Sequence, residues 1–267
     1  MKRSLAVLLL CFAATFASAQ AGDCASLTHQ ALELSGFNQA LDRITDVLSS
    51  PQFMQQIRGR ESADEFIAIF QPIMEKEFNA DLLRKEMQQR LSAQCDPEQM
   101  ALTVQRLQTP LMTKMLALEA ATNTPEGQEK LKKYARIASS LPLTDERLEA
   151  LDAVDNSMGA SDFATDTIMA VMTGLMTGVG APQEIVTQLQ THRGDMKAQM
   201  QNSVELSMSV TYHGVTRPEL LQYAKEVGAQ PLKSFYQQVD KSFVEIVQER
   251  ALALGQDLKE AIAARKN

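Results

Sequence analysis

The chain has 267 residues and a formal net charge of −7, with 33 acidic residues against 26 lysines and arginines. An acidic surface repels phosphate backbones and anionic headgroups, so this charge argues against a protein that binds nucleic acid or anionic lipid surfaces. The length suffices for one large hydrophobic core or two smaller ones.

The first 19 residues have the features of a cleaved signal peptide. Lys2 and Arg3 form a positive segment, residues 5–16 are apolar, and residues 17–19 give the small-x-small pattern after which signal peptidases cut. The apolar segment is shorter than the ~20 residues needed to cross a bilayer, and no later apolar run reaches that length. We therefore expect a periplasmic protein with no transmembrane segment, whose mature chain begins near Gln20.

Apolar residues recur at helical spacing along the rest of the chain, and alternating strand patterns are absent. Good helix formers such as Ala, Leu, Met, Gln, Glu and Lys dominate. In chain order, the apolar stripes are Leu27/Ala31/Leu34, Leu41/Ile44/Leu48, Phe66/Ile69/Phe70/Ile73, Ile185/Leu189/Met196/Met200 and Phe235/Val239/Phe243/Ile246/Val247. This pattern predicts an all-α protein.

Four helix starts are marked by the same capping chemistry, in which a side-chain oxygen comes just before a proline. A capping oxygen accepts hydrogen bonds from the free N–H groups of the first turn, and proline lacks the N–H that would be unpaired there. The four starts are at Asp96-Pro97, Thr109-Pro110, Thr124-Pro125 and Thr216-Arg217-Pro218. Pro72 is expected to kink or end the helix that contains it.

The capped prolines also indicate an internal repeat. A shift of 121 residues aligns Pro97 with Pro218 and Pro110 with Pro231, and apolar positions around them align as well. We therefore predict two duplicated helical-bundle domains in tandem. The predicted division is a signal peptide at 1–19, copy 1 at 20–122, a helical connector at 123–145 and copy 2 at 146–267.

Residues 96–111 and 216–232 carry a shared motif: a capped helix start with proline and acid, then a second proline followed by leucine. The motif resembles the end of an all-helical domain found in many exported bacterial proteins, a family known only as a domain of unknown function. Met112 and Lys233 stand where that family usually has glycine. The resemblance implies an all-α periplasmic domain and carries over no catalytic residue.

Cys24 and Cys95 are the cysteines left after removal of the predicted leader. An even count in an oxidising compartment favours pairing. A bond that closes a loop of roughly 70 residues would contribute about 4 kcal/mol in the chain-entropy description. We predict an intramolecular disulfide; free thiols and intermolecular pairing are the alternatives.

The sequence lacks the usual motifs for metal binding or catalysis. His29, His192 and His213 do not occur at zinc-binding spacings, and Gly-x-Ser-x-Gly, CxxC and Gly-rich phosphate loops are absent. We predict no metal ligand, no cofactor and no catalytic residue.

Two pairs of aspartates lie four residues apart, Asp42 with Asp46 and Asp162 with Asp166. Each pair would share a helix face, where burial can raise a carboxyl pKa as acid–base chemistry requires. In a chain this acidic, a solvated helix surface is the simpler interpretation. A hydrolase that uses these aspartates is the least favoured functional hypothesis.

Met169, Met172 and Met176 lie on one face of a predicted helix that also contains Gly174 and Gly178. Thioethers can bind Cu(I) or adapt to apolar partners, but the surrounding apolar residues favour ordinary core packing. An apolar interaction surface formed by the three methionines is the alternative. The Gly-x-x-x-Gly spacing would permit a second helix to approach closely.

Three functions remain as hypotheses. The leading one is a non-catalytic periplasmic protein that contacts another envelope protein, with the methionine face as its candidate surface. The second is a carrier that holds an apolar small molecule or lipid between helices. The third is the hydrolase with paired aspartates.

Overall fold

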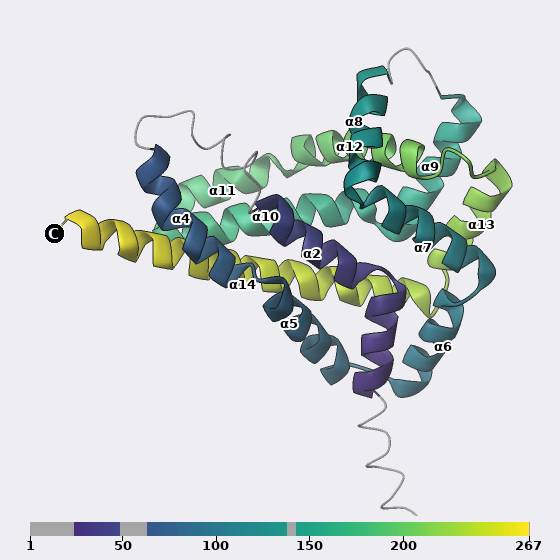
Figure 1. The fold of residues 1–267 in the computed structure, drawn as a ribbon, viewed down its shortest axis with the longest axis horizontal. Helices are drawn as coiled ribbons and strands as arrows, with labels where there is room; N and C mark the ends of the chain where they lie inside the picture. Colours follow the sequence, from purple (N-terminus) through teal and green to yellow (C-terminus); the bar gives the residue numbers. More distant parts are fainter. Residues whose placement is uncertain (1–23, 49–62, 138–142, 267) are drawn as a thin grey trace, which may run out of the picture.

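The computed structural model describes residues 24–48, 63–137 and 143–266, so the predicted signal peptide lies outside the described residues. Within these ranges all regular elements are helices, which confirms the all-α prediction. A helix over residues 24–34 comes first. The labelled helices are α2 (Phe37–Leu48), α4 (Ala63–Glu77), α5 (Ala80–Ala93), α6 (Pro97–Leu107), α7 (Pro110–Thr122), α8 (Pro125–Ile137), α9 (Asp145–Met158), α10 (Ala160–Val179), α11 (Gln183–Thr191), α12 (Arg193–Thr211), α13 (Arg217–Val227) and α14 (Leu232–Lys266) (Figure 1).

The predicted helix starts are confirmed, since α6, α7, α8 and α13 all begin directly after the expected residue. The expected cap is wrong for Thr109, whose hydroxyl donates to the Arg106 carbonyl oxygen at 2.9 Å and accepts no hydrogen bond from the first turn of α7. Asp96 accepts hydrogen bonds from the N–H groups of Glu98 and Gln99, at 2.9 and 3.2 Å. Thr216 forms a capping box with a glutamate three residues on. Pro72 lies inside α4, which continues to Glu77.

Cys24 and Cys95 form the predicted disulfide, with their sulfurs 2.12 Å apart and their Cα atoms 5.9 Å apart. The bond joins the start of the first helix to the turn between α5 and α6. The N-terminal end of the described chain is thereby fixed to the bundle. None of the helices in the described ranges is long and apolar enough to cross a membrane.

Helix α14 is the central element of the fold. Its 35 residues lie against α10 along most of that helix, and they also contact α4, α5 and α6 (Figure 1). Leu83 and Met115 from the first half of the chain and Tyr223 and Phe243 from the second half belong to one cluster of buried side chains. The two predicted copies therefore share a hydrophobic core.

Helices α6 and α13 correspond in length and burial, at 11 residues each, whereas α7 has 13 residues and α14 has 35. The buried positions of α6 are Met100, Thr103, Val104 and Leu107, and those of α13 are Leu220, Tyr223, Ala224 and Val227. They coincide at a shift of 120 residues, one fewer than the shift that aligns the prolines. The physical reason is that Pro97 is the first residue of α6, whereas Pro218 is the second residue of α13. This correspondence favours the predicted duplication, which stays a prediction.

Small residues allow α10 and α14 to approach closely. A Cβ atom added at Gly178 would lie 2.3 Å from the carbonyl oxygen of Leu252, and one added at Gly255 would lie 2.6 Å from that of Leu175. A Cβ at Gly174 would likewise meet the α14 backbone, at 2.4 Å. The Gly-x-x-x-Gly spacing thus serves tight packing between two helices of the same chain.

We expect Gly178→Ala to destabilise the fold by about 1–3 kcal/mol, because the new methyl group overlaps the α14 backbone. The matched control is Gly194→Ala near the start of α12, where an added Cβ meets nothing within 4 Å. That variant should be unchanged or slightly stabilised. Urea unfolding measures both, and equal stabilities of the two variants would contradict the close contact.

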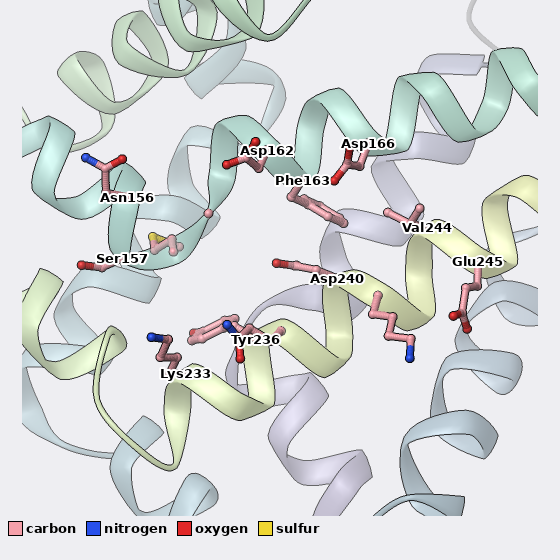
Figure 2. A pocket seen from close by; sticks show the side chains of 14 residues that line it. Asn156, Ser157, Asp162, Phe163, Asp166, Lys233, Tyr236, Asp240, Val244 and Glu245 are labelled. Carbon is pink, nitrogen blue, oxygen red and sulfur yellow. The ribbon is translucent and has the colours of Figure 1, made fainter. Parts of the chain in front are cut away.

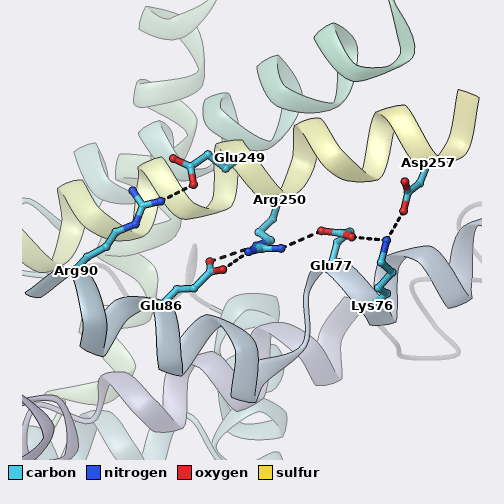
Figure 3. A network of polar contacts seen from close by, with 7 residues as sticks. All are labelled: Lys76, Glu77, Glu86, Arg90, Glu249, Arg250 and Asp257. Atoms are coloured by element: carbon cyan, nitrogen blue, oxygen red, sulfur yellow. Dashed lines mark hydrogen bonds and ion pairs between the residues drawn. The ribbon is translucent and has the colours of Figure 1, made fainter.

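A chain of ion pairs fixes α14 to the α4–α5 hairpin (Figure 3). Arg250 of α14 lies between Glu77 and Glu86, with its guanidinium 3.2 Å from the Glu77 carboxylate. Lys76 pairs with Glu77 at 3.0 Å and with Asp257 at 2.7 Å. Only 5 % of the Glu77 side chain is exposed, so Arg250 compensates a charge that water hardly reaches.

Candidate ligand-binding site

A cavity of about 470 Å³ opens between α14 and the junction of α9 with α10 (Figure 2). Gly159 forms this junction with a φ of 72°, a left-handed conformation that glycine adopts without strain. Asp155 stabilises the turn, because its carboxylate accepts hydrogen bonds from the N–H and the hydroxyl of Ser161, at 2.8 and 2.5 Å. The cavity therefore has a wall built from regular helices and a well-bonded turn.

A second cavity of about 190 Å³ shares part of its wall with the first. Met158, Phe163, Tyr236 and Asp240 line both. The rest of the smaller cavity is mostly apolar and is formed largely by α2, α7, α10 and α14, with Phe37, Ala40, Leu116, Ala120, Ala160 and Val239 among its lining residues. Ser35, Glu119 and Asn123 add polar groups to this lining. The two spaces together make a site with a polar part and an apolar part.

The two aspartates of α10 line the larger cavity, but cations from α12 already compensate them. Arg193 lies 2.6 Å from Asp166 and 3.6 Å from Asp162, and Lys197 lies 2.7 Å from Asp162. These hydrogen bonds and charges raise the pKa of the Arg193 guanidinium, with Asp166 as the largest cause. Asp162 and Asp166 thus act as anchors for α12.

Asp42, one member of the other predicted pair of aspartates, does not line this site. Asp42 is exposed on α2 and pairs with Arg84 of α5, and it does not line either cavity. The side chain of Asp46 lies outside the described residues. The structure therefore lends no support to a hydrolase that uses both pairs.

Asp240 is the functional candidate that the sequence analysis missed. It is half-buried on α14, and its carboxyl points into the larger cavity with Phe163 on one side and Tyr236 on the other (Figure 2). In the part of the chain that the structure describes, this carboxyl has no hydrogen bond and no ion pair. Burial, and then the charge of Asp166, raise the pKa of Asp240 to about 7.

One sequence signal could have pointed to Asp240. Tyr236, Asp240 and Val244 recur every four residues along α14, beside the apolar stripe of that helix. An acid between an aromatic and an aliphatic residue on one helix face is unusual for a surface position.

The hydroxyl of Tyr236 is buried and has no hydrogen-bond partner within the described ranges. Nearby, Glu119 of α7 accepts hydrogen bonds from the hydroxyls of Tyr212 and Tyr223, at 2.6 and 2.7 Å. Burial raises the pKa of Glu119, and the two tyrosine hydrogen bonds oppose this shift. The polar groups of Glu119, Tyr212 and Tyr223 therefore satisfy one another, whereas the Tyr236 hydroxyl has no such partner among the described residues.

The methionines and histidines of the sequence analysis do not form sites. Met169 is buried, with 4 % of its surface exposed, and Met172 and Met176 are half-buried, so the three do not make one exposed face. The burial of Met169 agrees with core packing, the favoured interpretation, and the interaction surface stays an alternative for the half-buried Met172 and Met176. His29, His192 and His213 are exposed and lie on separate elements. Among the described residues, no three His, Cys, Asp or Glu side chains are grouped as a metal ion would require.

Among the described residues, Asp240 and the two cavities therefore form the best candidate for a site that binds a small molecule. The resemblance to an exported helical domain family stays a prediction, since no family model, curated protein or solved structure matches the chain.

Proposed function

We propose that this protein is a non-catalytic, exported binding protein whose ligand occupies the two cavities between α10, α14 and their neighbours. The observation that carries the proposal is the carboxyl of Asp240, which is half-buried, uncompensated and directed into the larger cavity. A carboxyl taken out of water without a partner costs folding free energy. Groups retained at such a cost concentrate at functional sites.

The setting of Asp240 suits a ligand site. Small-molecule sites are concave, largely apolar and supplied with a few polar groups that fix the orientation of the ligand. Here Phe163, Tyr236 and Met158 provide the apolar wall, and Asp240 provides the polar group. All of these residues lie on helices, so the site is positioned by packing.

Export is supported by the disulfide between Cys24 and Cys95, because such bonds persist in oxidising compartments. The signal-peptide pattern of residues 1–19 points the same way. We therefore place the binding protein in the periplasm. Contact with another envelope protein stays a prediction, and of the three methionines considered for it Met169 is buried whereas Met172 and Met176 are half-buried.

Native mass spectrometry tests this proposal, with the protein expressed from its full-length gene and purified from the periplasm. The wild-type protein should retain a small molecule, and Val244→Trp should lose it, because Val244 lines the larger cavity and the indole would fill that space. The matched control is Ile262→Trp, at an exposed position of the same helix, which should keep the added mass. A bare mass for the wild type, or an adduct that survives Val244→Trp, would contradict the proposal.

A further inference from the structure

We infer that the ligand is a primary amine with an apolar chain, whose ammonium group lies beside Asp240 and whose chain enters the smaller cavity. This inference rests on the proposed function and adds the chemical class of the ligand. It follows from the charges around the larger cavity, from its aromatic wall and from the apolar lining of the smaller cavity.

The charges leave one carboxyl uncompensated. The two aspartates of α10 are paired with α12, and Glu245 pairs with Arg90 at 3.3 Å. Asp240, the remaining acid on the lining, has no such partner in the described chain. A cation placed there would supply the missing countercharge, whereas an anion would add a second like charge.

Two lysines, Lys233 and Lys241, also line the larger cavity, and both are exposed. The pKa of Asp240 is raised, by burial first and by Asp166 second, and neither lysine contributes an opposing effect. Within the described chain, neither lysine forms a hydrogen bond or an ion pair with the Asp240 carboxyl. The position beside Asp240 stays open for a cation from outside the chain.

The wall around Asp240 favours an organic cation. Phe163 and Tyr236 flank the carboxyl, and a cation near an aromatic face is attracted to the ring (Figure 2). A primary ammonium has three N–H donors, which can serve the carboxylate and further acceptors at the same time. Asn156 and Ser157, which line the larger cavity, carry side-chain oxygens of this kind.

The smaller cavity accounts for the apolar part of the ligand. Its lining includes Phe37, Leu116 and Val239, and it meets the larger cavity at Asp240 itself. An apolar chain attached to an ammonium group at Asp240 can therefore enter the smaller cavity and be buried there. Each methylene buried in this way strengthens binding about fourfold.

Calorimetric titration with hexylamine, 1-hexanol and hexanoate tests the inference on the full mature chain at pH 8, where Asp240 is largely ionised. Hexylamine should bind about tenfold or more tightly than hexanol, because its hydrogen bond to the carboxylate is charge-assisted. Hexanoate should bind more weakly than both. Butylamine, two methylenes shorter, should bind about fifteenfold more weakly than hexylamine.

Asp240→Asn should remove the preference for the amine over the alcohol. The matched control is Asp195→Asn in α12, whose carboxylate is 88 % exposed and remote from the lining, and it should keep the preference. Binding of hexanol or hexanoate as tight as that of hexylamine, or a preference that survives Asp240→Asn, would overturn the amine assignment and leave the cavity as a site. If none of the three compounds binds, the amine assignment is overturned as well. The proposed function is tested separately, by the mass of the ligand that copurifies with the protein.

Discussion

Replacement of Arg250 by alanine should lower the free energy of unfolding by about 3 kcal/mol, because it leaves the buried carboxylate of Glu77 with only the exposed Lys76 as a countercharge. The Glu77 side chain is 5 % exposed, and Arg250 and Lys76 are its partners. Arg250 also compensates Glu86 and joins α14 to both helices of the α4–α5 hairpin (Figure 3). Urea unfolding of the variant measures the loss.

Two further variants show whether the loss of stability comes from a buried charge or from the loss of an ion pair alone. Arg90→Ala removes a similar pair between α5 and α14, but its partners Glu245 and Glu249 are 48 % and 60 % exposed. It should cost less than about 1 kcal/mol, as exposed pairs do. The double variant Arg250→Ala with Glu77→Gln should recover part of the loss, since the buried charge is then gone. Equal losses for Arg90→Ala and Arg250→Ala would contradict this account.

Asp240→Asn should stabilise the protein at alkaline pH and leave it unchanged in acid. The reference pKa of an aspartate is 3.8, whereas that of Asp240 in the fold is about 7. Between these values the folded state holds a proton that the unfolded state has released, so the stability of the wild type falls as the pH rises from about 4 to 7. At pH 8 the variant should be more stable than the wild type by about 2–4 kcal/mol. The lower part of this range applies if water reaches the half-buried carboxyl and weakens the effect of burial.

Unfolding curves at several pH values from 4 to 8 measure this difference. The free energy of unfolding should fall more steeply with pH in the wild type than in Asp240→Asn. The difference in stability between the two proteins should therefore grow as the pH rises. Asp195→Asn, at an exposed position, should follow the wild-type profile. Parallel profiles for the wild type and Asp240→Asn would show that the carboxyl is not held in an unfavourable environment.

The helices could be predicted from the sequence because their signals are local. A capping oxygen before proline fixes where a helix such as α6 begins, and apolar spacing fixes which face is buried. The disulfide followed from the count of cysteines in an oxidising compartment. The register of the repeat was off by one residue, because an alignment on prolines ignores that Pro218 is one position further into its helix than Pro97.

The role of α14 could not be predicted in the same way. An apolar stripe shows that this helix is buried but does not show which elements cover it, and contacts with both α4 and α10 depend on pairings far apart in the chain. The sequence division into two halves therefore gave no sign of the core that they share.

The candidate site was predicted only in part. Asp162 and Asp166 do share a helix face at the cavity, but their compensation by Arg193 depends on how α12 folds back on α10. Asp240 had the appearance of a single acid on an amphipathic helix. Its partial burial depends on how α14 packs against α10, a contact between segments far apart in the chain.

A carbon-13 NMR titration of the side-chain carboxyl of Asp240 tests the central claim most directly, because it reports the charge of this one group with and without a cation beside it. For the mature protein alone, the titration should give a pKa of about 7, and saturation with hexylamine should lower it towards the ordinary range of an aspartate. A carboxyl that already titrates near pH 4 in the free protein, or one that hexylamine leaves unchanged, would contradict the assignment of Asp240 as the cation-binding group.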